Sequence, residues 1–136
     1  ASLRCGVAAL AKDAVGVCVF LGDMPLVPVE LCAPLAEAAI TAGYAARPVC
    51  EGRPGHPVAF TRAALCDLVT LNGDQGATAL LRQRSGDVAY YDVEDPGVLL
   101  DIDTPDDLAA ASDAWKHRAI SATSESATSR GAFPKP

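Results

Sequence analysis

The chain has 136 residues, 50% of them hydrophobic and 21% charged, which fits one globular domain. Eleven Lys and Arg face seventeen Asp and Glu, giving a formal net charge of -6, so the basic surface expected of a nucleic-acid-binding protein is missing. A phosphorylated ligand would therefore need a metal ion or local backbone amides to balance its charge.

The cysteines and the apolar runs exclude further classes of protein. The cysteine count is odd and contains no C-x-x-C pair, which argues against a disulfide framework and a zinc site and favours small buried residues, with a catalytic thiol as the alternative. Gly, Pro or charge interrupts each apolar run before the roughly 18 residues of a membrane helix, so no membrane partner is expected. The first residues lack a signal-peptide pattern, which predicts a cytoplasmic location.

The first predicted elements alternate between helix and strand. Apolar residues at helical spacing predict a helix within residues 2–11. The continuous apolar run 15–21 predicts a strand buried on both faces of a parallel sheet. Pro28 near the start and Gly43 just past the end predict a helix over 28–42.

The rest of the chain continues this alternation up to a polar tail. The expected elements are a strand over 45–50, a turn over 52–55, an extended piece over 57–60, a helix after Thr61, a short helix after the turn 72–76, strands over 87–93 and 98–102, and a helix from Pro105 to about Trp115. The pattern predicts an α/β layered sheet with ligands at the carboxyl ends of its strands. We expect one domain over 1–118 and a mobile, Ser- and Thr-rich tail over 119–136.

Asp23 directly follows the predicted strand 15–21. Gly22 before it allows close approach of the backbone to a ligand, and Pro25 after it stiffens the loop. A carboxylate at the carboxyl edge of a sheet can coordinate Mg²⁺ that bridges nucleotide phosphates. In the alternative interpretation, Asp23 only forms an Asx-turn.

Asp101 and Asp103 lie two residues apart at the predicted strand 98–102, so both side chains are expected on one face. Two such close carboxylates repel each other unless a cation lies between them, which favours a metal site. With Asp23 they would form a three-carboxylate pocket. Alternatively, Asp103 helps to cap the helix that begins at Thr104, and Asp101 is solvated.

Two loops are candidates for binding a ligand. The segment Gly52–Pro57 contains two Gly and two Pro, which fits a rigid loop that presents backbone amides and Arg53 to an anion while His56 contacts a substrate. The segment Gly73–Gly76 precedes a predicted helix, whose free N–H groups can hold an acidic group. The alternatives are a surface hydrogen bond for His56 and an ordinary tight turn at Gly73–Gly76.

Four segments, in this order, resemble the C-terminal two-thirds of the molybdenum cofactor nucleotidyltransferases, which carry a MobA-like NTP transferase domain; the MocA-type cytidylyltransferases resemble the chain most. The segments are Leu21–Leu26 (Leu-Gly-Asp-Met-Pro-Leu), Gly52–Val58 (Gly-Arg-Pro-Gly-His-Pro-Val), Leu71–Ala77 (Leu-Asn-Gly-Asp-Gln-Gly-Ala) and Asp95–Leu108 (Asp-Pro-Gly-Val-Leu-Leu-Asp-Ile-Asp-Thr-Pro-Asp-Asp-Leu). The segment Ser2–Gly6 also resembles a Ser-Leu-Arg segment of that family.

The resemblance implies a Rossmann-like nucleotidyltransferase fold, a three-layer sandwich with a mostly parallel sheet. It implies Mg²⁺, a nucleoside triphosphate, CTP in preference to GTP, and a molybdopterin-type cofactor whose terminal phosphate receives CMP while pyrophosphate leaves. By this resemblance Asp23 holds the metal with Asp101 or Asp103, and Asp23 and His56 are the catalytic residues. The residues implied at the nucleotide are Ser2, Arg4, Gly22 and Asp23, and those at the substrate are Pro25, Arg53, Gly55, His56, Gly73, Asp74, Gln75 and Gly76.

The chain departs from the family at one motif. Members begin with a strand and a Gly-rich Leu-Ala-Ala-Gly-x-Ser-x-Arg loop that wraps the triphosphate, and the 136 residues contain no such segment. We therefore expect a domain that lacks its N-terminal βαβ unit, is weak or inactive alone, and forms a homodimer that covers exposed sheet.

Two other functions stay open. One is a non-catalytic protein that binds or assembles the molybdenum cofactor, with molybdenum enzymes as clients. The other is a relative with oxidoreductase activity on the same scaffold, although no G-x-G-x-x-G segment supports it.

Overall fold

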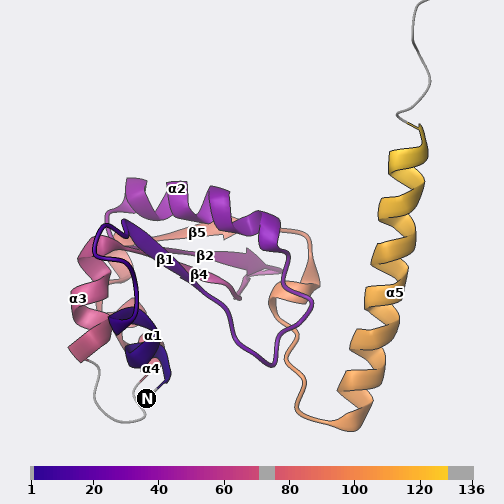
Figure 1. The fold of residues 1–136 in the computed structure, drawn as a ribbon, viewed down its shortest axis with the longest axis horizontal. Coiled ribbons are helices and arrows are strands. Elements are labelled where there is room, and N and C mark those ends of the chain that lie inside the picture. Colours follow the sequence, from indigo (N-terminus) through magenta and orange to yellow (C-terminus); the bar gives the residue numbers. More distant parts are fainter. Residues whose placement is uncertain (1, 71–75, 129–136) are drawn as a thin grey trace, which may run out of the picture. The chain divides into compact units, whose positions relative to one another are not determined.

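The computed structural model describes residues 2–70 and 76–128. The chain forms two units, Ala1–Leu100 and Asp101–Pro136. The first unit contains one open sheet flanked by helices (Figure 1), which confirms the predicted α/β fold class.

The sheet places neighbouring strands in an order that differs from their order in the chain. Its path is β1-β4-β2-β3, and β5 pairs with β2. The strands are β1 (Gly16–Val19), β2 (Ala45–Cys50), β3 (Arg53–Pro54), β4 (Val58–Thr61) and β5 (Val88–Asp92). Among the described strands, β1 therefore pairs with β4 alone and forms an edge.

The expected mostly parallel pairing needs a correction. Only β2 and β5 pair in parallel, whereas β1 with β4, β2 with β4 and β2 with β3 are antiparallel. The cause is the short connection from β2 through β3 to β4, because a hairpin reverses chain direction while helical crossovers preserve it. Since the reversed strand β4 lies between β1 and β2, strands β1, β2 and β5 all run in the same direction.

The helices cover both faces of this sheet. Helix α2 (Cys32–Ala42) packs on one face, where Leu35 and Ala39 contact Ala46 and Ala59. Helices α1 (Ser2–Ala8), α3 (Arg62–Thr70) and α4 (Gly76–Gln83) pack on the opposite face (Figure 1). Their apolar residues surround Phe60 in the larger part of the core. The three predicted layers are therefore present.

The end of α2 is set by a glycine, as the sequence predicts. Gly43 has φ 92°, a left-handed conformation that costs glycine little, and its N–H donates to the Ala39 carbonyl over 2.9 Å. The chain then reverses into β2, whose first residues are fully buried.

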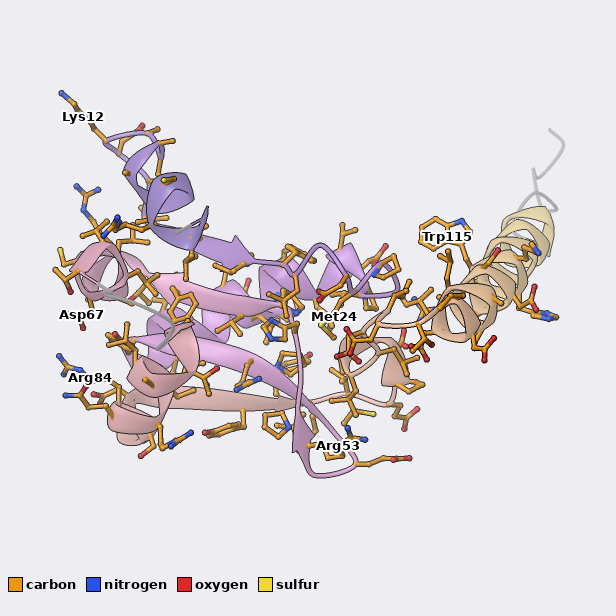
Figure 2. All side chains as sticks on the ribbon, turned by 90° about the horizontal axis from the view of Figure 1, so that it is seen from below. Lys12, Met24, Arg53, Asp67, Arg84 and Trp115 are labelled. Carbon is orange, nitrogen blue, oxygen red and sulfur yellow. The ribbon has the colours of Figure 1, made fainter. Side chains whose placement is uncertain are left out.

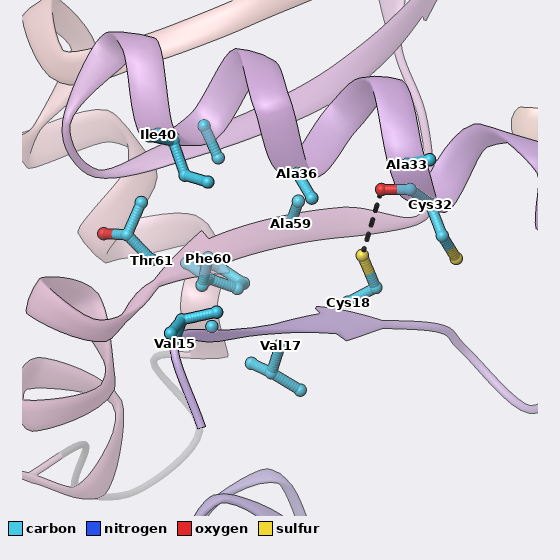
Figure 3. A pocket seen from close by; sticks show the side chains of 12 residues that line it. Val15, Val17, Cys18, Cys32, Ala33, Ala36, Ile40, Ala59, Phe60 and Thr61 are labelled. Atoms are coloured by element: carbon cyan, nitrogen blue, oxygen red, sulfur yellow. Dashed lines mark hydrogen bonds between the residues drawn. The ribbon is translucent and has the colours of Figure 1, made fainter. Parts of the chain in front are cut away.

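Strand β1 is less buried than predicted. Its residues alternate between the two sheet faces, with Val17 and Val19 on one and Cys18 on the other, but all are only half-buried. The cause is the position of β1 at the edge of the sheet. An apolar groove of about 400 Å³ lies between β1 and α2, and the Cys18 thiol donates to the Cys32 carbonyl across it over 3.8 Å (Figure 3).

The predicted strand over 98–102 is wrong. The chain forms a short 3-10 helix, η3 (Pro96–Val98), followed by irregular backbone. The Asp95 side chain accepts a hydrogen bond from the Gly97 N–H and starts this turn. The Val98 carbonyl accepts from the His56 N–H over 2.9 Å, so this segment bonds to a loop and does not extend the sheet.

The second unit contains the helix α5 (Pro105–Thr128). The Thr104 hydroxyl accepts from the Asp107 N–H, and the Asp107 carboxylate accepts from the Thr104 N–H, so the predicted cap is a reciprocal capping box. The helix continues past Trp115 and through the first part of the expected tail because no Gly or Pro interrupts residues 106–128. None of the described helices is long and apolar enough to span a membrane.

Candidate functional site

One cavity gathers several of the predicted site residues. It has a volume of about 590 Å³ and opens where β1 ends, beside the starts of α1 and α4. Its lining residues are Leu3, Val19, Phe20, Leu21, Gly22, His56, Val58, Phe60, Gly76, Ala77 and Thr78. Gly22, His56 and Gly76 come from three of the segments that carry the family resemblance, so segments far apart in the chain meet here.

The register of the sheet explains why two of these segments meet. Val19, the last residue of β1, pairs with Val58, the first residue of β4. Because the two strands are antiparallel, residues after Val19 lie beside residues before Val58. Gly22 and His56 therefore line the same cavity.

Asp23 follows Gly22 at this edge and is exposed. Its carboxylate lies near enough to His56 to favour the protonated imidazole. The next residue, Met24, is buried and anchors the loop, and its N–H donates to the Leu21 carbonyl over 3.2 Å. Asp23 is thus a solvent-accessible carboxylate on an anchored turn, and its role as a metal ligand stays a prediction.

His56 presents a buried polar atom without a partner. Its Nδ1 has no hydrogen-bond partner among the described residues. Burial lowers the pKa of His56 below its ordinary value of 6.5, the positive charge of Arg47 lowers it further, and the Val19 backbone and the Asp23 carboxylate oppose these effects. His56 is therefore neutral at pH 7 and offers a ligand a hydrogen bond without a charge.

The backbone that carries His56 is held from several sides. The Gly55 N–H donates to the Pro48 carbonyl over 2.8 Å, and the Gly55 carbonyl accepts from Nε and Nη2 of Arg47 over 3.3 and 3.0 Å. A Cβ at Gly55 would collide with the Val98 carbonyl. Gly55 thus contributes a close backbone contact behind His56 and does not itself line the cavity.

The start of α4 forms another wall of the cavity. Gly76, Ala77 and Thr78 line it, and the first N–H groups of a helix have no partner within that helix. Such free N–H groups can bind an anion, and the predicted role of this segment toward an acidic group stays a prediction. Gly73, Asp74 and Gln75 lie outside the described residues, so their predicted contacts with the substrate stay predictions.

Ser2, Arg4, Pro25 and Arg53 are the remaining predicted site residues of the first unit. Ser2 and Arg4 flank Leu3 in α1, and Arg4 is exposed. Pro25 is exposed in the loop after β1. Arg53 is exposed on β3, at the hairpin (Figure 2), and is not among the described residues that line the cavity. Its predicted role toward an anion stays a prediction.

Asp101 and Asp103 belong to the second unit. Both are exposed, and the strand that was expected to align their side chains is absent. The Asp103 N–H donates to the Asp107 carboxylate, so residue 103 joins the cap of α5 through its backbone. Their metal role with Asp23 stays a prediction. Within each unit, the described His, Cys, Asp and Glu residues form no group of three that could hold a metal ion.

Two further residues at this site were not predicted from the sequence. Thr78 places a hydroxyl in the first turn of α4, at the cavity wall. Arg47 is half-buried in β2, between Ala46 and Pro48, behind His56. A charged residue inside an otherwise apolar strand was the available signal, because such a residue is buried only where its donors find acceptors.

A family model described as the MobA-like NTP transferase domain matches residues 1–88. None of the curated proteins is significantly similar to the chain.

Solved structures of mycobacterial proteins are similar as well. Rv0371c of Mycobacterium tuberculosis H37Rv, in a structure described as a complex with manganese, is 30% identical with a TM-score of 0.65, over 81% of this chain and 58% of that one. Its homolog from Mycobacterium sp. strain JC1 is 27% identical with a TM-score of 0.66, over 81% of this chain and 55% of that one. The chain thus spans little more than half the length of these structures.

Proposed function

The chain belongs to the MobA-like NTP transferase domain family, and on that premise we propose that it acts in nucleotidyl transfer, moving CMP from CTP to the terminal phosphate of a molybdopterin-type cofactor. The observation that carries the proposal is that Gly22, His56 and the start of α4 line one cavity, while the Asp23 carboxylate next to Gly22 interacts electrostatically with His56. These are the segments in which the chain resembles molybdenum cofactor cytidylyltransferases.

The reaction requires no covalent intermediate with the protein. An oxygen of the terminal phosphate of the cofactor attacks the α-phosphorus of the nucleotide. A new P–O bond forms, the bond from the α-phosphorus to the β-phosphate oxygen breaks, and pyrophosphate leaves with the bonding electrons. The protein then contributes by placing the two phosphates in line and by stabilising negative charge.

A divalent metal fits the residues on the nucleotide side. Mg²⁺ and Mn²⁺ prefer oxygen ligands, and Mg²⁺ is commonly held by one or two carboxylates together with substrate phosphates and water. Asp23 supplies an accessible carboxylate at the carboxyl end of β1. The manganese complex of Rv0371c supports such a metal. When bound, it neutralises phosphate charge.

The substrate side is proposed to include His56 and α4. The neutral imidazole of His56, with its unpartnered Nδ1, donates to or accepts from a polar group of the cofactor. The N–H groups at the start of α4, with the Thr78 hydroxyl, bind an acidic group.

The first test is calorimetric titration of CTP and of GTP with Mg²⁺ or Mn²⁺. We expect binding that depends on the metal, with CTP bound more tightly. Asp23→Asn should weaken it at least about tenfold, because the neutral amide removes a charged oxygen ligand. Asp13→Asn, which removes the same charge from an exposed site before β1, should leave binding unchanged.

Two outcomes would contradict the proposal. One is the absence of metal-dependent nucleotide binding, both in the chain and in a version with a Gly-rich Leu-Ala-Ala-Gly-x-Ser-x-Arg segment fused ahead of Ala1. The other is equal binding by the Asp23 and Asp13 variants. Binding of the cofactor without any nucleotide dependence would favour a non-catalytic cofactor-binding protein, and NADPH oxidation would favour an oxidoreductase.

A further inference from the structure

Arg47 is the one arginine whose described side chain contacts the backbone next to His56. It lies in the middle of β2, paired in register with Tyr90 of β5, and it is half-buried. Among the described residues, no carboxylate lies within ion-pair distance of Arg47. Its guanidinium N–H groups donate to a backbone carbonyl and not to a carboxylate. This is unusual, because removing a charged group from water costs free energy that an ion pair would offset.

The Gly55 carbonyl needs such a donor. Gly55 is buried, and Pro48, Pro54 and Pro57 around it have no N–H to offer. Arg47 supplies two N–H groups to this one oxygen, over 3.3 and 3.0 Å. A buried carbonyl left without a donor is costly, so this contact fixes the position of Gly55.

Fixing Gly55 also fixes His56. The two residues share a peptide bond, and the His56 N–H donates to the Val98 carbonyl, against which Gly55 packs. The loop is thus held by Arg47 on one side and by Val98 on the other. His56 then enters the cavity wall from a backbone with little freedom.

We propose that Arg47 is a positioning residue: by donating twice to the Gly55 carbonyl it sets the backbone from which His56 contacts the substrate. This inference rests on the proposed function for the role of the substrate, whereas the contact itself does not. The charged groups that face His56 are Arg47 from β2 and Asp23 from the loop after β1. Of these, only Arg47 reaches the backbone of residue 55.

Amide hydrogen exchange of the 136-residue chain tests the backbone contact. Arg47→Met keeps the apolar stem of the side chain but removes its N–H donors. It should speed exchange at the Gly55 and His56 amides at least about tenfold. The Gly43 amide, which precedes β2 and donates to the Ala39 carbonyl, should exchange at an unchanged rate. Arg47→Lys should also speed exchange at these amides, because one ammonium cannot reproduce the planar fork of a guanidinium. Arg82→Met, an exposed arginine of α4, is the control.

Measuring the affinity for the cofactor tests whether Arg47 acts on substrate binding through His56. Arg47→Met and His56→Asn should each weaken binding of a molybdopterin-type cofactor, and the double variant should bind no more weakly than His56→Asn alone. Unchanged exchange at residues 55 and 56 in both Arg47 variants, or additive losses of affinity, would overturn the proposal. If neither the parent chain nor the version with the Gly-rich segment binds the cofactor, the proposed function fails, whereas the exchange result still decides whether Arg47 holds the loop.

Discussion

At the scale of single residues, Gly55 is a predicted site residue that packs against the backbone of the protein and does not line the cavity. The sequence places Gly55 in a rigid loop beside His56, and the backbone amides of this loop are predicted to bind an anion. The structure gives another reason for glycine, which is the close approach of the Val98 carbonyl and not an unusual backbone angle. Val98 is far along the chain, so no local pattern reveals this contact.

Replacing Gly55 tests that reason. Gly55→Ala forces a Cβ against the Val98 carbonyl, so we expect a loss of about 1–3 kcal/mol in the free energy of unfolding, measured by urea titration. Gly86→Ala is the matched control, because a Cβ there meets nothing within 4 Å. Equal unfolding midpoints for the two variants would show that the loop accommodates the added Cβ without a loss of stability.

At the scale of elements, local signals predicted the helices well and the strands less well. The helix predicted over 28–42 ends at Gly43 as expected, but it begins as a 3-10 helix, η1 (Val29–Leu31), with Pro28 at its N-cap, and α2 follows only from Cys32. The cap of α5 at Thr104 was also predicted. The apolar run 98–102 resembles a buried strand, but pairing depends on a free sheet edge beside it, and its Val98 carbonyl bonds to His56 instead.

The cap of α5 also predicts a pH dependence. The pKa of Asp107 is lowered from its ordinary 3.8, first by the Thr104 hydroxyl and then by the Thr104 N–H. A lowered carboxyl pKa means that the cap stabilises α5 above about pH 4 and that this stabilisation is lost as pH falls through the lowered value. NMR shifts at residues 104–108 should follow this titration.

The two acids in the first turn, Asp106 and Asp107, distinguish this cap from a general effect of charge at the helix start. Asp107→Asn should remove the titration step at residue 104, whereas Asp106→Asn, which has no such contact with Thr104, should retain it. Loss of the step in both variants would assign it to the helix dipole and not to the capping box.

At the scale of the whole molecule, strand β1 forms an edge of the sheet that could pair with a strand of another chain. Among the described strands it pairs with β4 alone, and it contains no charged residue or proline that would discourage pairing with another strand. Val15, just before it, is 75% exposed beside the apolar groove. The expected homodimer through this edge stays a prediction.

Sedimentation velocity over a range of concentrations measures that self-association. Val15→Lys places a charge at the rim of the groove and should shift the chain toward monomer. Val29→Lys adds the same charge at a site that is 68% exposed and outside the groove, and should not. A parent chain that stays monomeric, or equal effects of both variants, would refute association through β1.

Much of this protein was determined by the sequence itself. The alternation of apolar runs with Gly and Pro defined the α/β class, and the segments around Asp23, His56 and Gly76 defined the family, because turns, caps and motif loops depend on neighbouring residues. Tertiary structure alone decided that β4 lies reversed between β1 and β2, that Val19 pairs with Val58, and that Arg47 meets Gly55. These contacts depend on which strands become neighbours, and strand order is set by the packing of the whole core and not by any local segment.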